Sequence, residues 1–264
     1  MKNLKLYQVD AFTDKLFQGN PAAVSILDEW IDVDLMQNIS SENNLAETAF
    51  VVSKRDEFEI RWFTPKVEVD LCGHATLASA FVVFNFTDYK KDEIVFNSKS
   101  GILKVKKKDE FLELDFPVDK LMPVNNEEEI LDCVGIKPVD TLKGISDYFA
   151  VFNTESEIKN IKPDFGKIVK LNSRGLIVTA PGDEVDFVSR FFAPQLGIDE
   201  DPVTGSAHTS LTPYWSKKLN KKELKAEQLS SRGGQLFCTD CGDRIKIAGQ
   251  AKLYMIGDIY TGDF

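Results

Sequence analysis

One stretch decides the fold of this chain: Asp70-Leu71-Cys72-Gly73-His74-Ala75-Thr76-Leu77-Ala78-Ser79-Ala80-Phe81-Val82-Val83-Phe84. Its pattern indicates a strand end, a glycine hinge and then a helix that is apolar on nearly every face. Such a helix belongs in the interior of a protein, and at about eleven residues it is too short to span a membrane. We therefore expect a buried helix whose N-terminal N–H groups need an acceptor, for which an anionic ligand is a ready candidate.

The composition around this stretch is that of a globular protein. The chain has 264 residues, of which 43% are hydrophobic and 28% charged, enough for one large or two medium domains. Acidic residues outnumber basic ones by 42 to 32, and the net charge of −10 argues against a nucleic-acid partner and against an anionic membrane surface. Residues 1–7 show no signal-peptide core, and no apolar run approaches about 18 residues, so we expect a cytoplasmic protein with reduced cysteines.

The second half of the chain repeats the first. Three segments recur in the same order at offsets of 129, 132 and 133 residues: Arg61–Pro65 as Arg190–Pro194, Gly73–Thr76 as Gly205–His208, and Ser98–Gly101 as Ser231–Gly234. We therefore predict a tandem duplication with domains at 1–117 and 118–264, each with mixed strands wrapped around one helix. Two such domains commonly pack about a pseudo-twofold axis, and the cleft between domains is a preferred place for a ligand.

The remaining pattern predicts the elements of each half. A helix capped by Asp32 or Asp34 should run through Ser40, and a second glycine-initiated helix should run from Ser206 to about Leu219, kinked or bounded at Pro213. Residues 183–192 are predicted to form a helix, or a helix that runs into a strand. The expected strands are 5–11, 22–27, 46–53, 57–63, 93–96, 101–106, 111–116, 148–152 and 175–179.

The duplication singles out Glu47 as a candidate acid/base group. An offset of 129 places Leu176 opposite Glu47, and a slip of one residue would place Gly175 or Ile177 there, so only one half carries a carboxylate. Its apolar neighbours suggest a partly dry setting, which raises a carboxyl pKa and suits the group to proton transfer. The alternative interpretation is an exposed glutamate that caps a loop at a strand end.

The two histidines both lie within three residues of the repeated glycines. His74 is either a residue that satisfies backbone groups at a helix N-terminus or an acid/base group of the site. His208, one turn further into its helix, is expected to be structural. Cys238 and Cys241 form a single CxxC that aligns with the first half's hairpin, so we interpret it as a hairpin and expect neither zinc nor a redox motif.

The second glycine is surrounded by Asp201 and Ser206, which present a carboxylate and a hydroxyl. A turn or a helix cap would account for either residue alone. The two glycines, Gly73 and Gly205, then have a joint role: two helix N-termini that face one another could hold a carboxylate together, with glycine allowing close approach of the backbone.

At this point the chain resembles a known family, the PhzF-like phenazine-biosynthesis isomerases, which share the diaminopimelate-epimerase fold. The matching motifs extend nearly from end to end: Val9–Phe12, Phe17–Val24, Asn44–Phe50, Arg61–Pro65, Leu71–Ala78 and Asp201–His208. The resemblance implies an α+β fold of two barrel-like domains, each around a central helix. It also implies a cofactor-independent isomerase, without a metal, that often forms a homodimer.

The resemblance also assigns roles within the site. The acid/base carboxylate of the family falls on Glu47, and its supporting polar residues fall on His74, Asp201 and Ser206. The backbone at Gly73 and Gly205 would hold the substrate carboxylate, and Asn20 is a second-rank binding candidate. We therefore expect proton-transfer isomerisation of a small carboxylate-bearing metabolite.

Related epimerases carry a cysteine directly before each paired glycine, and the chain departs from this pattern. Cys72 stands at the first such place but Thr204 at the second, and a threonine hydroxyl is too weak an acid to mirror a thiol. Two alternatives stay open: an amino-acid-type epimerase or racemase that uses Cys72 with Glu47 as the opposing base, and a catalytically silent protein that binds a small acid.

Overall fold

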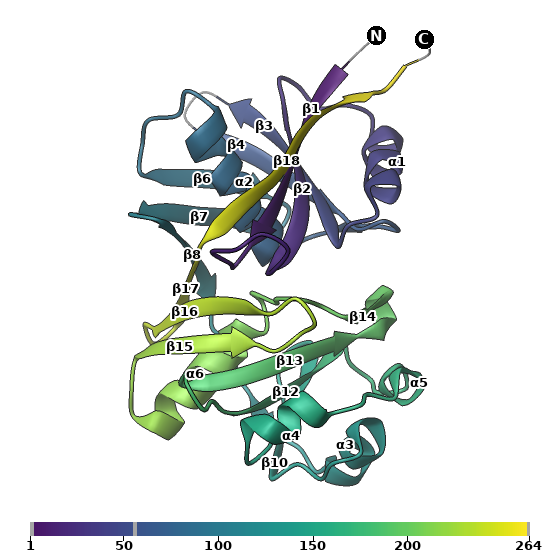
Figure 1. Ribbon diagram of the computed structural model, residues 1–264, viewed down its shortest axis with the longest axis vertical. Coiled ribbons are helices and arrows are strands. Elements are labelled where there is room, and N and C mark those ends of the chain that lie inside the picture. The colour runs from purple at the N-terminus through teal and green to yellow at the C-terminus, as the bar shows by residue number, and fades with distance from the viewer. Residues whose placement is uncertain (1–2, 55–56, 263–264) are drawn as a thin grey trace. The chain divides into compact units, whose positions relative to one another are not determined.

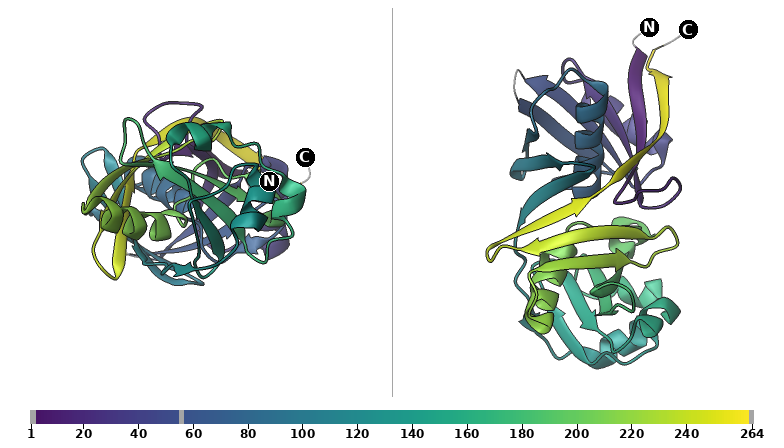
Figure 2. Two further views of the ribbon diagram at one scale, coloured as in Figure 1. Left: turned by 90° about the horizontal axis from the view of Figure 1, so that it is seen from below. Right: turned by 60° about the vertical axis from the view of Figure 1, so that its left-hand side comes forward.

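The chain divides into two compact units in the computed structural model, which describes residues 3–54 and 57–262. Unit 1 comprises residues 1–115 and 248–264, and unit 2 comprises residues 116–247. The first boundary lies two residues before the expected one at 117, but the expected domain 118–264 needs correction. Strand β18 (Ala251–Tyr260) belongs to unit 1 because it pairs antiparallel with β1 (Asn3–Ala11) along most of its length (Figure 2). Local patterning cannot reveal a partner at the opposite end of the chain.

Unit 1 is a mixed sheet with two helices. Its elements besides β1 and β18 are β2 (Asn20–Leu27), α1 (Val33–Asn43), β3 (Glu47–Lys54), β4 (Glu57–Phe63), β5 (Glu68–Val69), α2 (Gly73–Phe86), β6 (Glu93–Ser98), β7 (Gly101–Lys108) and β8 (Phe111–Pro117), whose last two residues belong to unit 2 (Figure 1). The strands pair in the order β18–β1–β2–β3–β4–β6–β7–β8, with β5 added beside β4. The pairs β2–β3 and β4–β6 are parallel, and the others are antiparallel.

Unit 2 repeats this plan. Its elements are β9 (Met122–Pro123), α3 (Glu127–Val134), β10 (Asp140–Lys143), β11 (Asp147–Val151), α4 (Glu155–Asn160), α5 (Phe165–Ile168), β12 (Gly175–Pro181), β13 (Phe187–Ala193), η1 (Pro194–Leu196), β14 (Ile198–Glu200), α6 (His208–Leu219), β15 (Glu223–Gln228), β16 (Gly234–Asp240) and β17 (Arg244–Gly249), which ends in unit 1. The strands pair in the order β9–β10–β11–β12–β13–β15–β16, with β14 beside β13, and again only the third and fifth pairs, β11–β12 and β13–β15, are parallel. This shared sequence of parallel and antiparallel pairs confirms the predicted duplication and the α+β fold class.

Helix α2 is the core of unit 1, as its sequence predicted. Leu77, Val82 and Val83 are fully buried, and the helix packs against β1, β2, β3 and β18. On the other side of the sheet, α1 covers β3 and β4 with Met36 and Ile39. No helix among residues 3–54 and 57–262 is long and apolar enough to cross a membrane.

Helix α6 continues through Pro213 instead of ending there. A proline inside a helix leaves the carbonyl four residues earlier without its donor, and here that carbonyl, Thr209 O, accepts a hydrogen bond from the Asp119 backbone N–H at 3.2 Å. The helix begins at His208, two residues later than predicted, because residues 205–207 form a turn. The predicted boundary at Pro213 is therefore wrong, because tertiary contact satisfies the freed carbonyl.

Residues 183–192 do not form the predicted helix. Residues 182–186 are a turn, and Phe187 starts strand β13. The turn is held from outside its own sequence: the Asp186 carboxylate accepts hydrogen bonds from Lys221 Nζ at 2.7 Å and from the Lys225 backbone N–H at 2.7 Å. Asp186 therefore anchors a turn, and only the strand part of the predicted helix-to-strand alternative is present.

The strand registers refine the alignment of the two units. Arg61 pairs with Glu68 through two hydrogen bonds of 2.7 and 2.8 Å, and Arg190 pairs with Glu200 in the same way at 2.7 and 2.9 Å. In the neighbouring strand, Thr48 lies opposite Phe63 and Leu176 lies opposite Phe192. Because Phe63 matches Phe192, Thr48 matches Leu176, and the residue that matches Glu47 is therefore Gly175.

Candidate active site in two groups

The predicted site residues fall into two groups, one in each unit. Asn20, Glu47, Gly73 and His74 lie at the starts of β2, β3 and α2 in unit 1. Asp201, Gly205 and Ser206 lie in the segment between β14 and α6 in unit 2. Each group contains the first residues of the glycine-initiated segment of its own unit.

Local turns bring Asn20 and Glu47 to the same edge of unit 1. Gly19 has φ +68°, and a Cβ there would lie 2.2 Å from the carbonyl oxygen of Ala11, so only glycine can start β2 in this way. Asn44 ends α1 in the left-handed conformation, with φ 48°. Strands β2 and β3 then run parallel, with Ala22 beside Glu47, so their first side chains lie at one end of the sheet.

Glu47 and His74 form a buried pair. Glu47 Oε2 lies 3.0 Å from His74 Nε2, and only 13% and 5% of the two side chains are exposed. The N–H is not aimed well enough for a hydrogen bond, and neither atom has another hydrogen-bond partner. The interpretation of Glu47 as an exposed strand-end residue is therefore wrong, and the partly dry setting is confirmed.

The other edge of the His74 ring faces two further groups. Asn20 Nδ2 lies 3.1 Å from His74 Nδ1, and Cys72 Sγ lies 3.5 Å from the same atom. Burial lowers the pKa of His74, but its electrostatic interactions and hydrogen bonds with Cys72 and Glu47 raise it well above its ordinary value. Burial, and then the charge of Glu47, raise the pKa of Cys72, which favours its neutral thiol over the thiolate.

Glu47, Cys72 and His74 also bring three potential metal-ligand atoms within 4.8 Å of one another. The cysteine lies at Nδ1 and the carboxylate at Nε2, on opposite edges of the imidazole. The three groups also form a chain of potential proton donors and acceptors around the imidazole.

The unit 2 group is organised by a buried glutamine. Gln228 is fully buried and donates through Nε2 to the Asp201 carbonyl at 2.7 Å, while its Oε1 accepts from the Thr204 N–H at 2.8 Å. The Thr204 hydroxyl donates to Asp201 Oδ2 at 2.6 Å. Gln228 thus fixes the segment that carries Asp201 and Gly205, a role that sequence reasoning missed because the partners are far apart in the chain.

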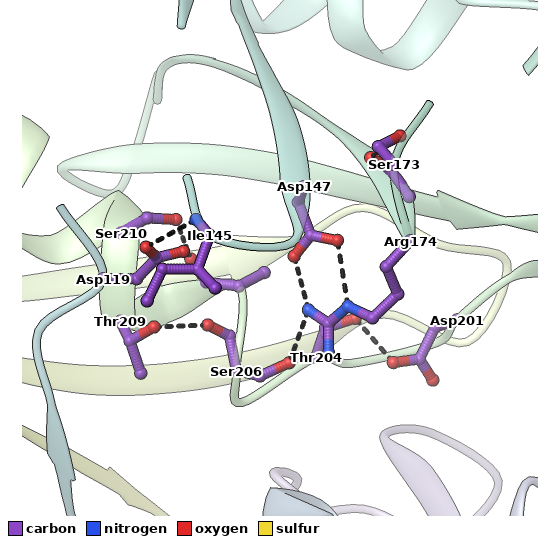
Figure 3. Close-up of polar contacts among 12 residues, drawn as sticks. Asp119, Ile145, Asp147, Ser173, Arg174, Asp201, Thr204, Ser206, Thr209 and Ser210 are labelled. Atoms are coloured by element: carbon purple, nitrogen blue, oxygen red, sulfur yellow. Dashed lines mark hydrogen bonds and ion pairs between the residues drawn. The ribbon is translucent and has the colours of Figure 1, made fainter. Parts of the chain in front are cut away.

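Two charged residues missed from the sequence complete this group. Arg174 Nε donates to Asp147 Oδ1 at 2.9 Å, and Arg174 Nη2 donates to Ser206 Oγ at 3.1 Å (Figure 3). Only 5% of the Asp147 side chain is exposed. Both residues lie where a strand begins, at the first residue of β11 and directly before β12. A charged residue at the start of an apolar strand was the sequence signal that could have identified them.

His208 is structural, as expected. It is fully buried, and its Nδ1 donates to the Thr204 carbonyl oxygen at 2.8 Å. Burial lowers its pKa to about 4, so the ring is neutral. Cys238 is buried in β16 and Cys241 is exposed in the turn after it, which confirms the hairpin interpretation.

Comparison with known proteins agrees with this fold and motif set. The family model described as phenazine biosynthesis-like protein matches residues 9–257. A protein from Pseudomonas aeruginosa called an uncharacterized isomerase is 50% identical over 97% of this chain and 98% of its own. The crystal structure of a PhzF-family phenazine biosynthesis protein from Enterococcus faecalis superposes with TM-score 0.94 and 47% identity, over 98% of this chain and 100% of that one.

A structure with much lower sequence identity has a similar fold. A hydroxyproline epimerase from Agrobacterium vitis superposes with TM-score 0.58 at 10% identity, over 97% of this chain and 92% of that one, a likeness of fold alone. The family model covers most of the chain, and the bacterial relative matches nearly its whole length. This chain therefore belongs to the phenazine biosynthesis-like, or PhzF, family of isomerases.

Proposed function

We propose that this isomerase moves a proton on a small carboxylate-bearing metabolite by general acid/base catalysis, with Glu47 as the base. One observation carries the proposal: the carboxylate of Glu47 is mostly buried, 3.0 Å from His74, while unit 2 has Gly175 at the matching place. A pair present in only one copy of a duplicated scaffold is not required for folding. We therefore assign this pair a functional role.

The proposed reaction is a proton shift without a cofactor. The Glu47 carboxylate takes a proton from a carbon next to a double bond or carbonyl, and the electron pair of that C–H bond delocalises into the neighbouring π system. The proton returns from Glu47 to another carbon of that system, so that atoms and charge balance. A positioned acid/base contributes about 10²–10⁴-fold to the rate, and orientation and electrostatics supply the rest.

The other site residues receive supporting roles in this proposal. His74 orients the Glu47 carboxylate, and Asn20, which contacts His74, helps to orient the substrate. Asp201 stabilises or relays charge. Backbone amides at Gly73, Gly205 and Ser206 bind the substrate carboxylate.

The test is Glu47→Gln assayed by deuterium uptake from heavy water into a panel of small unsaturated or amino carboxylic acids. The variant keeps the shape of the side chain but not its basicity, and we expect exchange to fall about 10²–10⁴-fold. Glu57→Gln, an exposed residue of β4, is the matched control and should exchange at the wild-type rate. Wild-type exchange by a folded Glu47→Gln variant would refute the mechanism.

A second candidate is an epimerase that uses Cys72 opposite Glu47. It is favoured by the buried thiol of Cys72, 3.5 Å from His74 Nδ1. Cys72→Ala distinguishes the two: the first mechanism predicts that exchange is retained, and the epimerase predicts that it is lost. A protein that binds the acid without catalysis would bind members of the panel and incorporate no deuterium.

We also propose that the protein forms a homodimer. Unit 1 exposes neighbouring aromatic side chains, Phe17 at 67% and Tyr254 at 49%, with ring centroids 5.8 Å apart. Exposed apolar clusters of this kind are typical of interaction surfaces. Sedimentation equilibrium of the full chain should give twice the monomer mass, and a monomer at all concentrations would contradict the proposal.

A further inference from the structure

We propose that the ion pair between Asp147 and Arg174 positions the Ser206 hydroxyl as a hydrogen-bond donor to the substrate carboxylate. The inference rests on the proposed function, in which Ser206 belongs to the carboxylate-binding group. It makes Arg174 and Asp147 positioning residues, which act on the ligand through Ser206.

The contacts fix the guanidinium of Arg174 on three sides. Nε donates to Asp147 Oδ1 at 2.9 Å, and Nη2 reaches both Asp147 Oδ2 and Ser206 Oγ, the latter at 3.1 Å (Figure 3). The guanidinium carbon lies 5.4 Å from the ring centroid of Phe191. A planar guanidinium held by a bidentate carboxylate and an aromatic face has little freedom to rotate, so its direction toward Ser206 is set.

The bond from Arg174 also restricts the direction of the Ser206 proton. A serine hydroxyl has one O–H donor and two acceptor lone pairs. Because Oγ accepts from Arg174, the O–H points away from the guanidinium. Among the contacts of residues 3–54 and 57–262, this hydroxyl donates to no protein acceptor. It is a donor directed away from the guanidinium, which suits an incoming anion.

Asp147 explains why Arg174 would act indirectly. Its carboxylate, 5% exposed, is paired with the guanidinium at two oxygens, so the charge of Arg174 is already compensated. Asp119 adds a second acidic group to this neighbourhood, where its Oδ1 accepts from the Ile145 N–H at 3.0 Å (Figure 3). A compensated cation is a poor direct partner for a substrate carboxylate, but it still polarises the hydroxyl that it contacts.

The duplication shows that the fold does not require this pair. By strand register, the residue that matches Arg174 in unit 1 is Ala46, and the residue that matches Ser206 is His74. The repeated ion pairs of the scaffold are Arg61–Glu68 and Arg190–Glu200. The Asp147–Arg174 pair belongs to unit 2 alone, at the helix start that the proposed function assigns to the carboxylate.

The experiment is a double-mutant cycle of Arg174→Gln and Ser206→Ala, with fumarate as the probe. Binding is followed through the backbone amide signals of residues 205–207 in ¹⁵N-labelled protein. All variants carry Glu47→Gln, so that binding is measured without the proposed chemistry. We expect each single variant to raise the Kd of fumarate about tenfold, and the double variant to raise it by no more than either one, because loss of one charge-assisted bond explains both effects.

Three results would overturn the inference: additive losses in the double variant, an equal loss in Arg190→Gln, or unchanged amide signals when fumarate is added to the protein without the cycle's substitutions. Arg190→Gln is the matched control because Arg190 also holds a bidentate carboxylate near an aromatic ring. If Arg174→Gln fails to fold, Asp147→Asn replaces it, and its loss should vanish in the Ser206→Ala background. Deuterium exchange decides the proposed function separately, so either can fail alone.

Discussion

The polar residues beside the glycine-initiated helix starts differ between the two units. In unit 1, Glu47 at the start of β3 faces His74, the second residue of α2. In unit 2, Arg174 just before β12 faces Ser206, one residue after the repeated glycine. Unit 1 therefore presents a carboxylate beside an imidazole, and unit 2 presents a hydroxyl that accepts a hydrogen bond from a guanidinium. The difference shows that the two copies of a duplicated scaffold can carry different polar groups at their helix starts.

The scaffold itself has changed much less than the site. The two Arg–Glu pairs keep the same bidentate geometry, and each guanidinium lies over a phenylalanine ring, at 5.3 Å for Arg61 over Phe63 and 4.9 Å for Arg190 over Phe192. These pairs tie β4 to β5 and β13 to β14 in the same register. Conserved geometry away from the helix starts, and divergence at them, separate the stabilising contacts from the proposed functional ones.

The largest expected effect concerns the two histidines, whose pKa values should be shifted in opposite directions from the ordinary value. The pKa of His208 is lowered from 6.5 to about 4, so the stability it contributes is present above pH 6.5 and is lost as the pH falls toward 4, by about 3 kcal/mol. The pKa of His74 is raised, so its contribution is present below pH 6.5 and is lost as the pH rises through the raised value. NMR titration of the imidazole signals measures both pKa values.

Urea unfolding of His208→Gln provides the control for this difference. The variant should lose the fall in stability between pH 6.5 and 4, because glutamine has no proton to gain. His74→Gln should leave that fall in place. If both histidines titrated near 6.5, the contrast between the two helix starts would be refuted.

The next effect tests why unit 2 has a glycine, Gly175, at the position that matches Glu47 in unit 1. A Cβ at Gly175 would lie 2.6 Å from the Phe191 ring and 2.7 Å from the Phe192 carbonyl oxygen. Gly175→Ala should therefore lower the free energy of unfolding by about 2 kcal/mol through overpacking, measured by urea denaturation. Gly166→Ala, whose Cβ would meet nothing closer than 3.4 Å, should be neutral or slightly stabilising. Equal behaviour of the two variants would contradict the steric explanation.

The smallest expected effect is a difference in how much the two repeated ion pairs contribute to stability. Arg190 donates to the carbonyls of Ile158 and Ile161 at 3.1 and 2.9 Å in addition to Glu200, whereas Arg61 has no such backbone acceptors among the contacts of the described residues. Arg190→Met should therefore cost about 1 kcal/mol more than Arg61→Met in urea unfolding. An equal or larger loss for Arg61→Met would contradict this prediction.

Much of the fold could be predicted from the sequence because its signals are local. The apolar run after Gly73 predicted the buried helix α2, and the recurring motifs predicted the duplication. The error at residues 183–192 arose where a turn is held by Lys221 and Lys225. Pro213 was misjudged for a similar reason, since the carbonyl that it frees is satisfied by Asp119.

The sequence by itself determined the duplicated α+β plan, the family and the choice of Glu47, because periodicity and repeated motifs are carried by neighbouring residues. Only the tertiary structure decided that β18 joins unit 1, that Gly175 matches Glu47, and that Asp147 and Arg174 hold Ser206. The physical reason is that strand register and ion pairs join residues far apart in the chain, and their partners are selected by packing.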